Sequence, residues 1–195
     1  MIASEAHARE EIARYCSLLW ERRLVSGTSG NVSMRLDDGD ALITPSLRSL
    51  RDLAPAEIVR VDAFGIPRDA RQRPSSELPL HLAAYTVRPE ARCLIHTHPT
   101  FSVVWSKTGS IFPRDTVGAK ETLGPVAWTA YREPGTHDLA YLCADEFKRG
   151  FDTVLMERHG VSALADELER AFVLTDLAEE AARIAYFSRL ADLTD

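Results

Sequence analysis

Strand-like segments occupy the middle of this chain, and segments with helical periodicity lie at its two ends and between the strands. Strands are predicted at 32–36, 41–44, 58–62, 93–97, 126–131 and 153–157, and helices at 4–24, 77–87, 137–149 and 166–189. The apolar run at 100–106 fits either type, since periodicity alone does not separate a short buried strand from a helix. Because the strands do not alternate strictly with helices, the order predicts an α/β layered fold around a mixed or antiparallel β-sheet.

End signals mark several of these elements. Ser4 and Thr136 are residue types that cap helix N-termini, and Pro79 suits the first turn of the helix at 77–87. Asp37-Asp38-Gly39-Asp40 separates two short strands and is typical of a hairpin turn. The spacing of the final helix predicts a buried side, which comprises Leu168, Phe172, Thr175, Ala178, Ala182 and Tyr186.

Composition limits the class of protein. The 195 residues show no repeat, low-complexity tract or long linker, so we expect a single domain over residues 1–195. The net charge of −6 argues against a nucleic-acid partner, since the 23 Lys and Arg are scattered among 29 Asp and Glu. No apolar run approaches the roughly 20 residues of a membrane helix, and the acidic N-terminus is unlike a signal peptide. We therefore expect a cytoplasmic protein without a membrane partner.

The three cysteines give no sign of a disulfide framework. Cys16, Cys93 and Cys143 are odd in number, far apart and outside any CxxC motif. We expect all three to be buried, reduced thiols.

The strongest local signal is Ile95-His96-Thr97-His98-Pro99. Side chains two apart on a strand point to the same face, so His96 and His98 can offer two imidazoles to one ion. Catalytic zinc sites typically use three protein ligands and keep one position open. His159, at the end of a predicted strand and before a glycine, is the best placed third ligand, because the other histidines fall on helices. Taken alone, an HxH pair is more often chance or structural than a metal site.

Two further segments have both a functional and a structural interpretation. Glu77, in Pro74-Ser75-Ser76-Glu77, is a candidate acid or base, but Glu at this spacing is also typical of a helix start. The loop at 27–33, GTSGNVS, offers small residues and polar donors to an anion, and it equally suits a plain turn before the hairpin. On these residues alone the structural interpretations are the simpler ones.

Taken in order, the motifs resemble the class II aldolase/adducin family over about residues 12–186. The matching segments are GTSGNVS at 27–33, ITPS at 43–46, SSE at 75–77, HTHP at 96–99, PGT at 134–136 and RHGV at 158–161. Each is weak alone, and together in this order they are specific. The resemblance implies a single-domain, three-layer α/β fold around a central mixed or antiparallel sheet.

The resemblance also implies roles for particular residues. His96, His98 and His159 match the ligands of a divalent ion, expected to be Zn²⁺. Glu77 matches the catalytic acid/base and is also expected to ligate the resting metal. The positions that match a substrate-phosphate pocket are Gly30, Asn31, Ser46, Leu47, Ser75 and Ser76. The implied protein is a class II, zinc-dependent aldolase that forms a homotetramer and acts on a small molecule. It would cleave or form a C–C bond of a phosphorylated, sugar-like hydroxy-carbonyl through a metal-stabilised enediolate.

The sequence departs from the family pattern at two places. Leu47 stands where the family usually has Gly, which narrows the accessible backbone conformations of the phosphate pocket. The segment 113–117 lacks the Tyr found near this point in sugar-phosphate aldolases, and the tail that supplies another Tyr is also missing after the last helix. A decarboxylase, dehydratase or 4-epimerase with the same metal site therefore remains an alternative. A non-catalytic adducin-like binding protein is the least favoured, because the three histidines and Glu77 are kept together.

Overall fold

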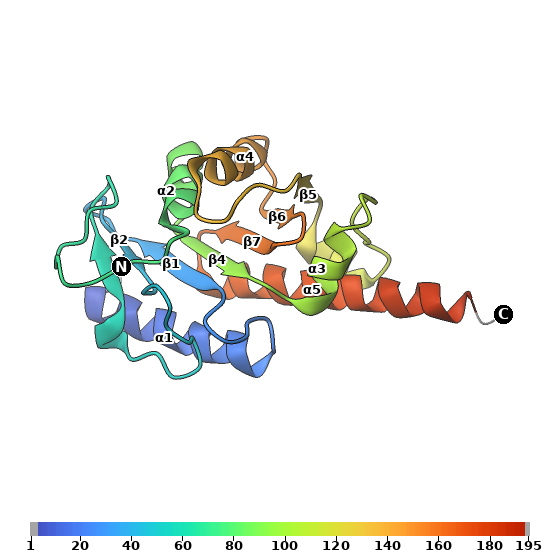
Figure 1. The fold of residues 1–195 in the computed structure, drawn as a ribbon, viewed down its shortest axis with the longest axis horizontal. Helices are drawn as coiled ribbons and strands as arrows, with labels where there is room; N and C mark the ends of the chain where they lie inside the picture. Colours follow the sequence, from blue (N-terminus) through green and yellow to red (C-terminus); the bar gives the residue numbers. More distant parts are fainter. Residues whose placement is uncertain (1–3, 194–195) are drawn as a thin grey trace.

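The structure, a computed structural model, describes residues 4–193 and is built on one seven-stranded sheet (Figure 1). The strands are β1 (Asn31–Arg35), β2 (Ala41–Ile43), β3 (Val59–Val61), β4 (Cys93–Thr97), β5 (Val126–Thr129), β6 (Thr153–Met156) and β7 (Gly160–Ala165). They lie in the order β3-β2-β1-β4-β7-β6-β5. Every neighbouring pair is antiparallel except β5 and β6, which are parallel. The prediction of a mixed, mainly antiparallel sheet is confirmed.

Helices cover both faces of the sheet and make three layers (Figure 1). On one face lie α1 (Glu5–Glu21), α3 (Thr100–Ser106) and α5 (Leu168–Ala191), and on the other α2 (Leu78–Val87) and α4 (His137–Lys148). A short 3₁₀ turn at Pro55–Glu57 and a π-helical turn at Ala119–Leu123 complete the elements. Neighbouring residues of β4 enter different cores, since Ile95 packs with the α1 and α5 side chains and Leu94 with those of α2 and α4. His96 therefore faces the α2 side of the sheet, as Leu94 does.

The helix-start signals in the sequence act as expected. Ser4 Oγ accepts a hydrogen bond from the backbone N–H of His7 at 3.3 Å, and Thr136 Oγ1 accepts one from Leu139 N–H at 3.3 Å. The ambiguous run at 100–106 is helix α3. Its first N–H groups donate to the carboxylate of Glu179 on α5, a cap from a distant segment that local sequence does not reveal.

Strand β7 and the end of α5 differ from the sequence prediction. Strand β7 was not predicted, because its sequence GVSALA contains Gly and two Ala, residue types that are depleted in strands. Tyr186, expected on the buried side of the last helix, is 38% exposed because the end of α5 projects beyond the sheet (Figure 1).

The cysteine prediction is confirmed, since Cys16, Cys93 and Cys143 are all free and buried. Burial raises the pKa of the Cys93 and Cys143 thiols to about 12, which keeps them protonated at neutral pH. Among residues 4–193, no helix combines the length and the apolar character needed to cross a membrane.

Candidate metal centre

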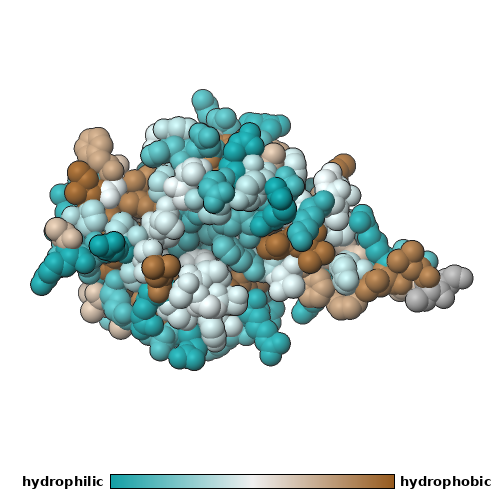
Figure 2. Space-filling model, in the orientation of Figure 1, coloured by the Kyte–Doolittle hydropathy of each residue, from teal (hydrophilic) through white to brown (hydrophobic). Residues whose placement is uncertain are grey.

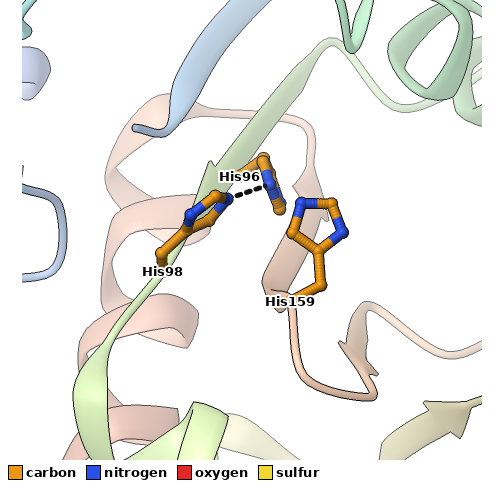
Figure 3. Close-up of side chains that lie close together, drawn as sticks. All are labelled: His96, His98 and His159. Carbon is orange, nitrogen blue, oxygen red and sulfur yellow. Dashed lines mark hydrogen bonds between the residues drawn. The ribbon is translucent and has the colours of Figure 1, made fainter. Parts of the chain in front are cut away.

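Three histidines from two parts of the chain meet at the end of β4 (Figure 3). His96 lies on β4, His98 follows that strand, and His159 lies in the turn between β6 and β7. Because β4 pairs with β7 in a register that places Thr97 opposite Val161, the turn carrying His159 reaches the end of β4. One ring nitrogen from each histidine lies within 4.8 Å of the others, and no other such group of three occurs in the described part of the chain.

Hydrogen bonds fix the ring of His96. Its Nδ1 lies 3.2 Å from the carbonyl oxygen of Val161 and 3.1 Å from Ser162 Oγ. A carbonyl oxygen only accepts, so Nδ1 carries the proton and Nε2 presents its lone pair. That lone pair faces His98 Nε2 at 2.8 Å. An imidazole whose second nitrogen is held by a carbonyl is the usual form of a metal-ligating histidine.

Gly160 allows the two halves of the cluster to approach. A Cβ at this position would lie 2.1 Å from the carbonyl oxygen of Thr97 and 2.9 Å from a ring carbon of His98. The residue before His159 is also constrained, since Arg158 has φ 56° and its N–H donates to Ser106 Oγ at 2.8 Å. A left-handed conformation costs a non-glycine residue about 1–2 kcal/mol. The turn thus keeps Arg158 in an unfavourable backbone conformation and thereby fixes the position of His159.

The three rings are neutral at physiological pH. Burial is the main cause that lowers the pKa of His98, lowers that of His159 to about 4, and brings that of His96 well below its ordinary value. Neutral rings present lone pairs, so two facing nitrogens such as those of His96 and His98 need a shared proton or a cation between them. Nδ1 of His159 is buried and has no hydrogen-bond partner among residues 4–193, so this nitrogen is not held by the described part of the chain. The donor set fits a divalent ion such as Zn²⁺.

Burial of these neutral histidines makes the metal-free protein sensitive to acid. Because the pKa of His159 is about 4 in the fold and 6.5 in its ordinary state, the unfolded chain binds the proton first as pH falls. The free energy of unfolding should fall between about pH 6.5 and 4, by about 1.4 kcal/mol per pH unit for each such histidine. Urea unfolding in a chelator at several pH values measures this slope.

His159→Gln tests the origin of that slope, and His7→Gln is its control, since His7 is exposed on α1. His159→Gln should make the slope shallower by about 1.4 kcal/mol per pH unit, and His7→Gln should leave it unchanged. Equal slopes in the wild type and His159→Gln would contradict a neutral, buried His159.

Glu77 lies immediately before α2 and is only 6% exposed. Its side chain makes no capping hydrogen bond, so the interpretation as a simple helix cap finds no support. Burial raises the pKa of Glu77 above its ordinary 4.5, and the backbone N–H of Gly135 opposes this rise. Glu77 is not a member of the ligand group formed by the histidines. The chemistry open to a buried carboxyl with a raised pKa is proton transfer.

The segments that match a phosphate pocket come together beside Glu77. Ser46 N–H donates to Arg73 O, and Ser75 N–H donates to Thr44 O, each at 3.0 Å, so the segments around Ser46 and Ser75 run side by side. Asn31 begins β1 and pairs with His96. Ser76 is exposed and touches the PGT segment, since a Cβ on Gly135 would lie 3.2 Å from its carbonyl oxygen. The first turn of the pocket contains Gly30, whose φ of 82° and contact with Val25 exclude a side chain.

Leu47 keeps the backbone conformation that favours glycine. Its φ is 58° and its side chain is 86% exposed. The loop therefore retains a left-handed residue at the position where the family pattern has Gly, at a cost of about 1–2 kcal/mol. The apolar side chain stands in solvent next to the candidate phosphate pocket.

Sequence analysis missed two elements of this site. The sequence shows Gly160 only as part of a motif, and its close contact with β4 depends on a pairing that the sequence does not show. The position of His81 on a helix predicts no role in the site, whereas in the fold its ring is fully buried beside Asn31, with Nε2 2.5 Å from Asn31 Oδ1. The sequence signal that could have revealed His81 is the presence of polar residues, His81 and Tyr85, on the otherwise apolar face of α2.

The sequence is similar to proteins of one known family. The sequence profile of the Class II Aldolase and Adducin N-terminal domain matches residues 10–186. The chain belongs to this family. It is 30% identical to the L-fuculose phosphate aldolase of Methanocaldococcus jannaschii, over 93% of this chain and 97% of that protein. It is 33% identical to the 3-oxo-tetronate 4-phosphate decarboxylase of Cupriavidus necator, over 92% of this chain and 84% of that protein.

The fold agrees with the same family. The crystal structure of L-fuculose-1-phosphate aldolase from Thermus thermophilus superposes with a TM-score of 0.87 at 26% sequence identity, covering 99% of this chain and 98% of that one. The relatives of this class II aldolase family member thus include both aldolases and decarboxylases.

Proposed function

We propose that this protein is a zinc-dependent lyase that cleaves or forms a C–C bond in a small, phosphorylated hydroxy-carbonyl compound. The observation that carries the proposal is the set of three neutral histidines, His96, His98 and His159, on the side of the sheet where Glu77 is buried. A divalent ion held there would supply Lewis-acid polarisation of a substrate oxygen. The resemblance to aldolases and decarboxylases of phosphorylated substrates supports the substrate class.

The chain's own residues supply proton transfer and binding. Glu77 takes the proton of a substrate hydroxyl and returns one to carbon, a task for which its raised pKa is suited. Gly135 N–H fixes the ionised carboxylate. The phosphate is bound by the hydroxyls of Ser46, Ser75 and Ser76 and by the amide of Asn31, which lie on the adjoining segments. The burial of the site excludes water from the carboxyl group.

Decarboxylation is the second candidate reaction. The 33% identity to a 3-oxo-tetronate 4-phosphate decarboxylase favours it, and Leu47 and the tyrosine-free segment 113–117 distinguish this chain from the sugar-phosphate aldolase pattern. Dehydration and 4-epimerisation use the same kind of stabilised carbanion and are less supported. A non-catalytic adducin-like role is the least supported, because nothing in a binding protein requires three potential metal ligands together with a buried Glu77.

A screen of the zinc-loaded protein tests the proposal. Sugar phosphates, acyclic sugar acids and phosphorylated β-keto acids are supplied, and both aldehyde and CO₂ are measured. We expect turnover with at least one phosphorylated compound, with aldehyde released by an aldolase and CO₂ by a decarboxylase. Turnover only of unphosphorylated compounds would contradict the substrate class, and no turnover in either assay would contradict the lyase activity. The cytoplasmic location stays a prediction.

We expect a homo-oligomer, and a tetramer on family resemblance. The projecting end of α5 exposes Ile184, Phe187 and Leu190, and Ile111 is exposed beside it; apolar side chains gather at this end of the molecule (Figure 2). Apolar patches of this kind mark protein interfaces. The sedimentation mass should be a multiple of the 21.7 kDa chain. Phe187→Asp should reduce this mass, whereas Phe64→Asp, at another exposed apolar residue, should not; a monomer mass for the wild type contradicts the prediction.

A further inference from the structure

A buried network of polar side chains connects α2 with β1 on the side of the sheet that carries His96. Asn31 and Ser33 are two apart on β1 and share a face, and His81 and Tyr85 are four apart on α2 and share a face. His81 Nε2 lies 2.5 Å from Asn31 Oδ1, His81 Nδ1 lies 2.6 Å from Ser33 Oγ, and the Tyr85 hydroxyl lies 2.5 Å from Ser33 Oγ. All four residues are buried. None of these bonds belongs to the histidine cluster.

The amide oxygen of Asn31 sets the direction of the hydrogen bonds in this network. Asn31 Oδ1 faces His81 Nε2, and an amide oxygen only accepts, so Nε2 carries a proton. In a neutral ring Nδ1 then accepts from the Ser33 hydroxyl, and Ser33 Oγ accepts from the Tyr85 hydroxyl.

The burial of His81 agrees with this tautomer. Burial lowers the pKa of His81 to about 3, so the ring is neutral and has a single N–H. With Nδ1 accepting from Ser33, that N–H is at Nε2 and donates to Asn31 Oδ1. The amide oxygen of Asn31 is thereby turned toward α2, and its NH₂ group is turned away.

The NH₂ group of Asn31 is available to a ligand. Within residues 4–193 it donates to no protein acceptor, and it is not among the enclosed side-chain atoms that lack partners. It therefore keeps access to the space outside the protein. Asn31 pairs across the sheet with His96, so this open donor lies next to the candidate metal centre.

We propose that His81 is a positioning residue that holds the side-chain amide of Asn31 with its NH₂ group toward the site, as a donor to an anionic substrate oxygen. The identity of that oxygen as a phosphate oxygen rests on the proposed function. Without the hydrogen bond from His81, the amide could turn and present its oxygen, which would repel an anion. The network thus acts on substrate binding through Asn31.

The first test reads the tautomer of His81 directly. The zinc-loaded, full-length protein is labelled with ¹⁵N-histidine, and long-range ¹H–¹⁵N correlations identify which ring nitrogen carries the proton, with assignment by comparison to His81→Gln. If that variant does not fold, His81 is assigned by elimination from variants of the other histidines. We expect the proton on Nε2 of His81. A proton on Nδ1 would reverse the chain and overturn the proposal.

The second test uses inorganic phosphate as the probe and titration calorimetry as the readout. Asn31→Asp keeps an acceptor for His81 but removes the donor, so phosphate affinity should fall by at least about tenfold, the equivalent of one hydrogen bond. Tyr85→Phe removes the hydroxyl that donates to Ser33, so the Ser33–His81 hydrogen bond can reverse, and phosphate binding should weaken by about 3- to 10-fold. Tyr15→Phe removes a hydroxyl from another buried tyrosine, on α1, and should leave phosphate binding unchanged.

The double variant separates positioning from general stability. A carboxylate has two equivalent oxygens and no orientation to lose, so Tyr85→Phe should have no further effect on phosphate affinity in the Asn31→Asp background. Equal effects of Tyr85→Phe in both backgrounds, or a lowered melting temperature with unchanged phosphate affinity, would show a purely structural network and overturn the proposal.

The outcomes also separate this inference from the proposed lyase activity. Turnover in the substrate screen by a protein that does not bind phosphate would overturn the role of Asn31 and leave the lyase activity standing. Phosphate binding that depends on Asn31 and Tyr85 as described, without turnover of any compound, would support the positioning role and contradict the lyase activity.

Discussion

Glu77→Gln should lower turnover by about 10²–10⁴-fold, the range that a general acid or base contributes. The substitution keeps the size of the side chain and removes its ability to exchange a proton. Metal content should stay at the wild-type level, because the three histidines form the ligand group without Glu77. Turnover of an identified substrate and elemental analysis of the same preparation measure both effects.

In contrast to its effect on turnover, Glu77→Gln should not lower the stability of the fold. Because burial raises the pKa of Glu77, the fold binds its proton more tightly than the unfolded chain does, and stability falls as pH rises from about 4.5 through the pKa in the fold. Gln carries no charge and avoids this loss. The metal-free Glu77→Gln protein should therefore melt at the same temperature as the wild type at neutral pH, or higher.

Glu167 offers a matched control for Glu77. It is also a glutamate at the N-cap of a helix, before α5, and its side chain also makes no capping bond, but it is exposed and lies outside the motif segments. Glu167→Gln should leave turnover unchanged. Turnover of Glu77→Gln within about threefold of the wild type would be too small a loss for a general base and would remove Glu77 from the mechanism.

His96→Ala and His159→Ala should each abolish metal binding at stoichiometric concentrations and all metal-dependent activity. Loss of a residue that only orients a ligand lowers metal affinity by about 10–100-fold, so loss of a ligand itself should cost at least about 100-fold. The wild-type protein should hold about one Zn²⁺ per chain, because the three histidines form a single site. Elemental analysis after gel filtration, with a competing chelator for affinity, measures the change.

His7→Ala is the control for these two variants, because His7 is exposed on α1 and outside the cluster. It should retain full metal content and activity. The His96 variant must also be shown to fold, since its Nδ1 bonds to β7 are lost, and a cooperative melting transition is sufficient for this. Full metal content in both His96→Ala and His159→Ala would contradict the assignment of the site.

The features that the sequence by itself determined are those set by local geometry. Side chains two apart on a strand share a face, so the pairing of His96 with His98 follows from the segment alone. Ser4 and Thr136 act as helix caps because a cap depends on only the next three residues. The mixed sheet between two helical layers followed from the order of elements and from the family resemblance carried by short motifs.

Only the tertiary structure decided which segments meet. His159 reaches His96 because β7 pairs with β4, and β7 itself was not predicted because it consists largely of small residues that are depleted in strands. The burial of Glu77 and the network of His81 likewise arise from the packing of α2 over β1. Periodicity reports which side of a segment faces a core, but it does not report which other segment forms that core. Contacts between residues about 50 or more positions apart depend on the closure of the whole sheet and its helices, and no local pattern encodes them.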